Sequence, residues 1–230
     1  DLKDARHFGW DVPDCKFDWD RLRDNVQAEV TRLEGLYGQT LENHKVTVFK
    51  TRATIAGPQK VRLADGTELT AERILVATGG WPHVPEFPGS EHAITSNEVF
   101  HLDKLPKRVV IAGGGYIANE FAGIFNEFGS KVTIVNRGDT ILRGYDEQIR
   151  DRLLQISMTK GIDFKFNAPF EKIVKNDDGT LTVHLGGCEP IVADAVLVAA
   201  GRVPNTKGVG LEEVGVDLDD HGAIKVDESN

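Results

Sequence analysis

Residues 109–120 read Val-Val-Ile-Ala-Gly-Gly-Gly-Tyr-Ile-Ala-Asn-Glu, and this stretch constrains the fold more than any other feature of the chain. An apolar strand is predicted over residues 109–112, a helix over 116–128 and a second apolar strand over 132–135. Gly129 ends the predicted helix. Two strands joined by a helix are typical of a parallel strand-helix-strand unit. The sequence therefore predicts an α/β fold with a Rossmann-like domain.

Gly113, Gly115 and Ala118 form a GxGxxA pattern where the first strand gives way to the helix. Gly113 permits the tight turn, Gly115 allows a pyrophosphate to approach the backbone, and Ala118 lets the helix pack closely on the strand. The helix N-terminus offers unpaired N–H groups and a partial positive charge to phosphates. A flexible turn is the alternative, but the strand-helix-strand context favours dinucleotide binding.

The residues that end the second strand indicate which dinucleotide binds. Val135, Asn136 and Arg137 lie about 20 residues after the glycines, where a site for NAD places Asp or Glu to hold the ribose 2′-hydroxyl. No carboxylate stands at these three positions. Arg137 and Arg143 are instead expected to bind the 2′-phosphate that distinguishes NADPH. In the alternative, both arginines are solvated loop residues and Asp139 binds the ribose.

The first third of the chain has a different pattern. Apolar residues recur at three- and four-residue steps from Trp19 to Leu41, which predicts a long amphipathic helix with Asp18 as its N-cap. An Asp-Gly turn at Asp65 and Gly66 predicts a hairpin. Strands are predicted over residues 45–55, 60–63, 68–70 and 74–77, the last of them buried, and a proline-rich connection over residues 81–90.

The second half of the chain returns to alternating helices and strands. A helix is predicted over residues 147–160 and a strand over 162–166. Three strands joined by glycine turns then predict an antiparallel meander. The meander strands are expected over residues 171–175, 181–185 and 189–193, followed by an apolar strand over 195–199 and a short strand over 223–226.

Composition excludes several classes of protein. The 230 residues are 40% hydrophobic and 27% charged, with a net charge of -9 and no block of like charge, so neither nucleic acid nor an anionic membrane is an expected partner. No apolar run approaches the roughly 18 residues of a membrane span. Cys15 and Cys188 are the only cysteines, and the seven histidines lack ligand spacing, so no metal site is predicted. A reducing, cytoplasmic setting is expected.

The order of motifs resembles that of the two-dinucleotide-binding flavoprotein disulfide reductases, and in particular their glutathione-disulfide reductase branch. The resemblance covers essentially the whole chain. The motifs that carry it are, in chain order, Thr78-Gly79-Gly80, Ile94-Thr95-Ser96, Gly115-Tyr116-Ile117-Ala118, Arg137 with Arg143, and Gly201-Arg202-Val203-Pro204-Asn205-Thr206.

The resemblance implies an enzyme in which NADPH reduces FAD, FAD reduces an active-site disulfide, and the dithiol reduces glutathione disulfide, within a homodimer. It implies an NADPH-binding domain over residues 82–203, inserted between residues 1–81 and 204–230 of an FAD-binding domain. The family's first flavin fingerprint, its pair of redox cysteines and its C-terminal interface domain have no counterpart in this sequence. We therefore expect no turnover from the chain by itself.

The resemblance also implies roles for single residues. Tyr116 would cover the flavin until the nicotinamide displaces it, and Glu120 would lie near the nicotinamide carboxamide. The alternatives are a tyrosine packed on its own domain and a solvated glutamate near the helix N-terminus. Tyr37 would reach glutathione, although the helix stripe also explains it as a core residue. Further expected contacts are Gly113, Gly114, Gly115, Ile117 and Gly201 for NADPH, and Ala53, Thr78 and Gly79 for FAD.

Two other interpretations remain at this point. Dihydrolipoamide dehydrogenase, mercuric reductase and trypanothione reductase share the motif layout. Asn136 and Arg137 in place of a terminal glutamate argue against the NAD-dependent member, and Tyr37 favours glutathione. The alternative from a different class is a non-catalytic, redox-sensing module that binds a dinucleotide. Absence of FAD from the purified parent protein would favour this alternative.

Overall fold

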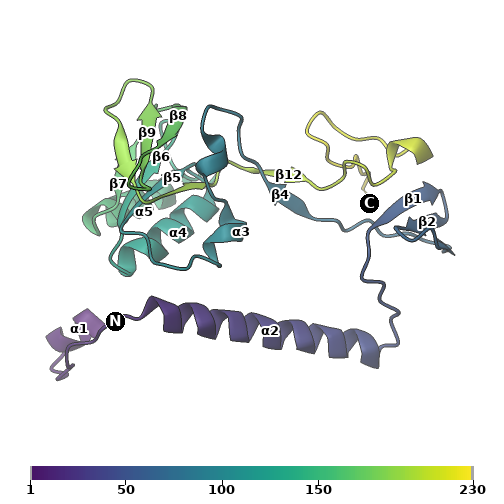
Figure 1. The fold of residues 1–230 in the computed structure, drawn as a ribbon, viewed down its shortest axis with the longest axis horizontal. Coiled ribbons are helices and arrows are strands. Elements are labelled where there is room, and N and C mark those ends of the chain that lie inside the picture. Colours follow the sequence, from purple (N-terminus) through teal and green to yellow (C-terminus); the bar gives the residue numbers. More distant parts are fainter. Residues whose placement is uncertain (1, 229–230) are drawn as a thin grey trace.

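A parallel sheet forms the centre of the larger group of elements in this computed structural model, which describes residues 2–228 (Figure 1). The strand order is β11-β5-β6-β7, and all three pairings are parallel. Helix α4 (Tyr116–Glu127) connects β5 to β6, so the predicted α/β unit is confirmed. The strands are β5 (Arg108–Ala112), β6 (Lys131–Val135), β7 (Asp163–Lys165) and β11 (Ala195–Val198).

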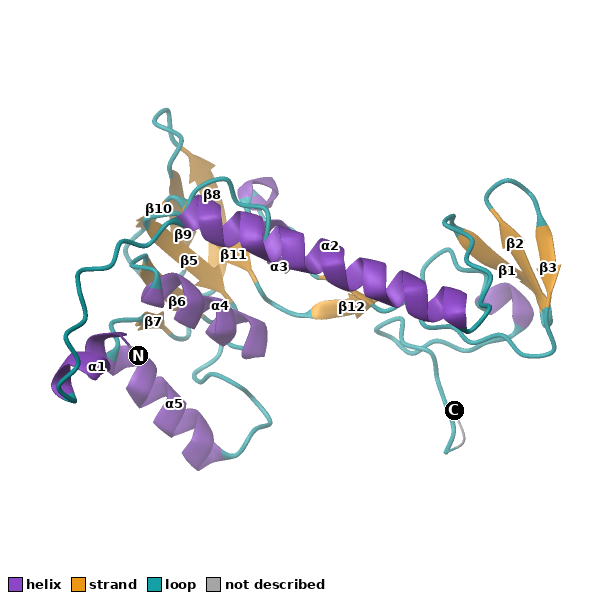
Figure 2. Ribbon diagram, turned by 90° about the horizontal axis from the view of Figure 1, so that it is seen from below, coloured by secondary structure: helices purple, strands orange, loops and turns teal. Residues whose placement is uncertain are grey.

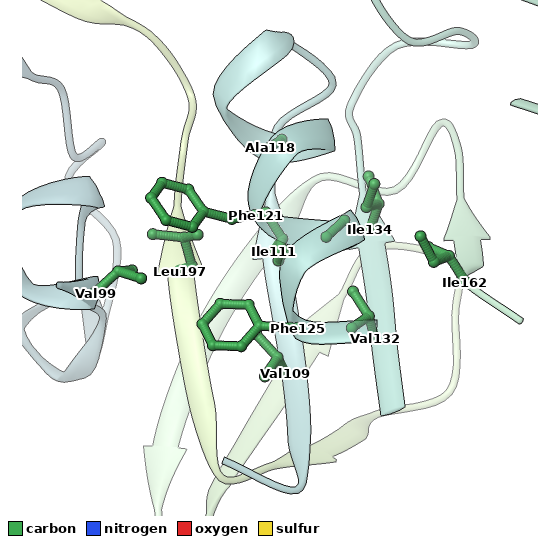
Figure 3. Packing of buried hydrophobic residues seen from close by; sticks show 11 residues of the cluster. Val99, Val109, Ile111, Ala118, Phe121, Phe125, Val132, Ile134, Ile162 and Leu197 are labelled. Atoms are coloured by element: carbon green, nitrogen blue, oxygen red, sulfur yellow. The ribbon is translucent and has the colours of Figure 1, made fainter. Parts of the chain in front are cut away.

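The core of this unit has two layers because β5 is covered on both faces. Val109 and Ile111 point toward α4, where Phe121 and Phe125 pack over them (Figure 3). Val110 points the other way and belongs to the second layer. This alternation, with all three strand residues at most 2% exposed, is what a strand buried on both faces requires.

An antiparallel meander covers the second face of the sheet. Its strands run in the order β10-β9-β8, as the turn pattern predicts, and their apolar residues complete the second layer of the core. Helix α5 precedes β7 and has no buried residue. Elements not yet bounded in this unit are β8 (Phe170–Lys175), β9 (Leu181–Leu185), β10 (Ile191–Ala193), α5 (Glu147–Thr159), α3 (Ser96–Val99) and the 3-10 helix η1 (Ser90–His92).

A smaller sheet lies at the other end of the molecule (Figure 1). Its order is β1-β2-β3, and the predicted Asp-Gly turn joins β2 to β3, with Gly66 at a φ of 88°. Two short strands, β4 and β12, pair antiparallel and run between the two groups of elements (Figure 1). The bounds are β1 (Ala53–Gly57), β2 (Lys60–Leu63), β3 (Glu68–Thr70), β4 (Gly80–Pro82), β12 (Arg202–Pro204) and the 3-10 helix η2 (Glu212–Val214).

The long helix α2 (Trp19–Asn43) extends from the parallel-sheet unit toward the small sheet (Figure 2). The predicted N-cap is confirmed, because the Asp18 carboxylate accepts a hydrogen bond from the backbone N–H of Arg21 at 3.0 Å. No residue of α2 is buried. The interpretation of Tyr37 as a core residue is therefore wrong, since its exposed fraction is 72%. A short helix, α1 (Leu2–His7), precedes α2.

Three strand predictions need correction. Residues 45–52 are not a strand, and β1 begins only at Ala53. Residues 74–77 form neither a strand nor a buried segment, and Leu75 is 90% exposed. Residues 223–226 contribute one isolated bridge, Leu218 to Ile224. In each case the apolar pattern was present, but the described part of the chain supplies no neighbouring strand to complete a ladder.

Candidate dinucleotide-binding site

A pocket of about 850 Å³ lies at the carboxyl ends of β5, β6 and β11. This edge is where open parallel sheets bind ligands. Five segments meet there, although they are separated in the sequence. The lining residues come from 83–87, from the glycine turn at 112–117, from the arginine loop at 135–145, and from 198–202, with Ala168, Pro169 and Phe170 closing one side.

The glycines of the turn differ in how much room a side chain would have. Gly113 has a φ of 131°, and a Cβ atom there would lie 2.3 Å from the carbonyl oxygen of Ala199. Gly115 is the N-cap of α4, and a Cβ atom there would meet no protein atom within 4 Å. The backbone at the start of α4 is therefore open to the pocket, and its N–H groups are available to an anion.

The arginine loop is attached directly to the glycine turn. The backbone N–H of Leu142 donates to the carbonyl of Gly114 at 2.7 Å. Arg137 and Arg143, at the two ends of the loop, both line the pocket, whereas Asp139 does not. The alternative in which Asp139 holds the ribose gains no support from this arrangement.

Positive charge dominates the pocket. Three arginines line it, and Glu86 is the one carboxylate residue among the described lining residues. Arg202 is the third arginine, and sequence reasoning did not assign it to the site. Its guanidinium donates to the carbonyl of Gly80, so it also joins β12 to β4. Its place after Gly201, in a segment that already carried the family resemblance, was the available signal.

The other predicted nicotinamide-side residues divide into two groups. Tyr116, Ile117 and Gly201 line the pocket. Tyr116, at the start of α4, is 53% exposed, so it is not packed into its own domain. Glu120 lies one turn further along α4, is exposed, and does not line the pocket.

The residues predicted to contact FAD and glutathione lie outside this pocket. Ala53, Thr78 and Gly79 are exposed. Asn205 bonds to two of them, because its backbone N–H donates to the carbonyl of Gly79 at 2.9 Å and its amide donates to the carbonyl of Thr78 at 3.4 Å. Tyr37 is on α2.

Three other features of the described residues bear on function: the cysteines, possible metal ligands and possible membrane spans. Cys15 and Cys188 are free thiols. No cluster of His, Cys, Asp or Glu suited to a metal ion occurs within residues 2–228. Of the helices described, none combines the length and the apolar character needed to cross a membrane.

The fold and the pocket define a Rossmann-type α/β protein with its ligand edge at the ends of the parallel strands. A model of the family described as pyridine nucleotide-disulphide oxidoreductase matches residues 3–230. The chain belongs to that family.

Relatives of known name agree with this assignment. The chain is 44% identical to a glutathione reductase from Burkholderia cepacia over 99% of its length, and 39% identical to the chloroplastic/mitochondrial glutathione reductase of Pisum sativum, again over 99%. It is 36% identical to a trypanothione reductase from Trypanosoma congolense over 99%. These matches cover 50%, 41% and 49% of the relatives, so the chain spans about half their length.

Solved structures show the same relationship. The HOCl-induced flavoprotein disulfide reductase RclA from Escherichia coli superposes with a TM-score of 0.86 at 29% sequence identity. The match covers 98% of this chain and 51% of RclA. The similarity therefore extends over both groups of elements and α2, since it includes nearly the whole chain.

Proposed function

We propose that this chain is the NADPH-binding part of an enzyme that reduces glutathione disulfide through FAD and an active-site dithiol. One observation carries the proposal: Arg137 and Arg143 line the same pocket as the glycine turn. A phosphate on the adenosine ribose and a pyrophosphate on the helix N-terminus then have separate, preformed partners in one cavity. The named relatives, two of which are glutathione reductases, support the choice of substrate.

The residues present fit a nicotinamide dinucleotide. The pyrophosphate would lie over Gly115, where the space beside the backbone is open, and the 2′-phosphate between the two arginines. When bound, NADPH supplies the hydride. Tyr116 would shield the reacting face of the flavin until the nicotinamide enters, because its exposed ring borders the pocket. Glu120, one turn along α4, would face the carboxamide.

The domain division belongs to this proposal. Residues 82–203 would form the NADPH-binding domain, and residues 1–81 and 204–230 would be parts of an FAD-binding domain. Two contacts support a return of the chain after β12. Ile55 in β1 donates its N–H to the carbonyl of Val209 at 2.7 Å, and Gly210 lies so close to Ile55 that a Cβ atom would clash with its carbonyl oxygen.

The remaining assignments concern the whole enzyme. FAD would contact Ala53, Thr78 and Gly79, and glutathione disulfide would meet the exposed hydroxyl of Tyr37. A homodimer is expected of the complete protein, and a cytoplasmic location remains part of the proposal.

Calorimetric titration of the chain with NADPH and, separately, with NADH tests the proposal. A clear preference for NADPH is expected. Preference for NADH would instead favour the dihydrolipoamide branch, and binding of neither by a chain that is folded by circular dichroism would overturn the site.

The substrate assignment must be tested on the complete enzyme. We expect a yellow, FAD-containing protein that oxidises NADPH with glutathione disulfide faster than with trypanothione disulfide or lipoamide. A colourless protein without disulfide reduction would favour the non-catalytic, redox-sensing module.

A further inference from the structure

Asn136 follows β6 directly and is one of the three positions at which a site for NAD is expected to carry a carboxylate. Its backbone is held on both sides. The N–H of Asn136 donates to the carbonyl of Lys165 at 2.8 Å, and its carbonyl accepts from the N–H of Ala168 at 3.1 Å. The direction in which the side chain leaves the backbone is therefore set by the edge of the sheet.

The side-chain amide of Asn136 forms a hydrogen bond within the arginine loop and lies against the glycine turn. Its Nδ2 atom donates to the carbonyl of Thr140, within the arginine loop, at 2.6 Å. The same atom lies 2.6 Å from the point that a Cβ atom on Gly114 would occupy. The amide thus fits between the loop and the glycine turn only because Gly114 has no side chain.

The bond requires a donor at position 136. Thr140 contributes a backbone carbonyl, which can only accept, and an ionised aspartate would present a second acceptor to it. The nearly isosteric carboxylate would lose the bond, and its charge would also lie next to Arg137.

We propose that Asn136 is a positioning residue that fixes the shape of the arginine loop where it lies against the glycine turn, and through it the preference for NADPH. This inference rests on the proposed NADPH site. The two arginines are the residues that would touch the 2′-phosphate, and Asn136 acts through them. The pyrophosphate and nicotinamide, which NADH shares, would bind to the glycine turn and the rest of the pocket.

The test compares Asn136→Ala and Asn136→Asp with the unmodified chain in calorimetric titrations with NADPH and NADH. Loss of one such hydrogen bond corresponds to about a fivefold change in an equilibrium constant. We expect Asn136→Ala to lower the ratio of NADPH affinity to NADH affinity about fivefold, and Asn136→Asp to lower it further. Asn126→Ala is the matched control, because the Asn126 amide also donates to a backbone carbonyl, that of Lys160 at 3.1 Å, away from the pocket.

The outcomes separate this inference from the proposed function. No preference for NADPH in the unmodified chain would overturn the function and leave Asn136 without a role. A preference that both variants retain within twofold would overturn the inference alone, as would an equal loss of both cofactors. If circular dichroism shows that Asn136→Ala is unfolded, Asn136→Asp provides the test, because it keeps the shape of the side chain. An unchanged ratio of NADPH affinity to NADH affinity in Asn136→Asp would then overturn the inference.

Discussion

A two-pronged ion pair joins Arg108, the first residue of β5, to Asp194, the residue just before β11. The guanidinium Nη2 lies 2.8 Å from Oδ1 of Asp194, and Nε lies 3.1 Å from Oδ2. The backbone N–H of Arg108 also donates to Oδ2 at 2.8 Å. The pair therefore fastens β11 to β5 at the end of the strands opposite the pocket.

This pair predicts an acid-sensitive contribution to stability. The hydrogen bonds from Arg108 hold the pKa of Asp194 below its ordinary value. A lowered pKa means that the contribution is present above the unfolded-state pKa, about 3.9, and is lost as the pH falls through the folded-state value. We expect Asp194→Asn to lower the free energy of unfolding by about 1 kcal/mol at pH 7.

Urea unfolding from pH 3 to pH 8 measures this effect. The difference between Asp194→Asn and the unmodified chain should be constant above pH 5 and shrink below pH 4. Asp151→Asn, at an exposed position on α5, serves as the control and should change little. A difference that does not depend on pH would show that the carboxylate charge contributes nothing.

The two glycines at the start of α4 predict opposite outcomes. Gly113→Ala places a Cβ atom against the carbonyl of Ala199 at a positive φ, and should lower the free energy of unfolding by about 2 kcal/mol or more. Gly115→Ala has open space and a φ of -78°, so the fold should tolerate it. The added methyl group should nevertheless weaken NADPH and NADH alike, by about tenfold. Urea unfolding and calorimetry measure the two effects, and unchanged binding by Gly115→Ala would place the pyrophosphate elsewhere.

Arg137→Leu tests recognition of the 2′-phosphate. Loss of a charge-assisted, bidentate contact should weaken NADPH about ten- to a hundredfold and leave NADH within about twofold. Arg152→Leu, at an exposed position on α5 outside the pocket, is the matched control. Titration in increasing salt gives a second readout, because the preference of the unmodified chain should decline as charges are screened. Equal loss of both cofactors would mean that Arg137 supports the loop and does not contact the phosphate.

Tyr37→Phe tests the substrate side in the complete enzyme. The hydroxyl is exposed on α2, away from the dinucleotide pocket. We expect the KM for glutathione disulfide to rise about fivefold, the value of one hydrogen bond, with unchanged affinity for NADPH. Steady-state kinetics with the disulfide as the varied substrate measures the change, and an unaltered KM would remove Tyr37 from the substrate site.

The parallel unit was predictable because its signals are local. Gly113, Gly115 and Ala118 act within one turn of chain, and the apolar runs of β5 and β6 pack against each other and the helix between them. The predicted buried strand at residues 74–77 failed for the opposite reason. An apolar run reports what a segment is able to bury, but burial also requires a surface to pack against, and Leu75 has none in the described structure.

In the candidate site, too, the residues with local sequence signals were predictable and those that depend on tertiary contacts were not. Arg137 and Arg143 were predicted from their distance after the glycine turn. Arg202 and Asn136 were not assigned, because their roles depend on contacts between segments that only the fold brings together. The amide of Asn136 is interpretable once Gly114 and Thr140 are known to lie on either side of it.

In the described structure, the side-chain hydrogen bonds that attach helix α2 to the parallel-sheet unit lie near one end of the helix. Trp19, Arg23 and Gln27 donate side-chain hydrogen bonds to the carbonyls of Leu102, Asp103 and Phe100, all near the helix N-terminus. Its 25 residues extend about 37 Å, and the apolar side chains of the second half are exposed.

Helices of this length are marginally stable in water without packing. Among the hydrogen-bonded amides of the helix, exchange should therefore be slowest near Arg23 and quicken steadily toward Asn43, so that the helix unfolds from its far end while the parallel sheet stays folded.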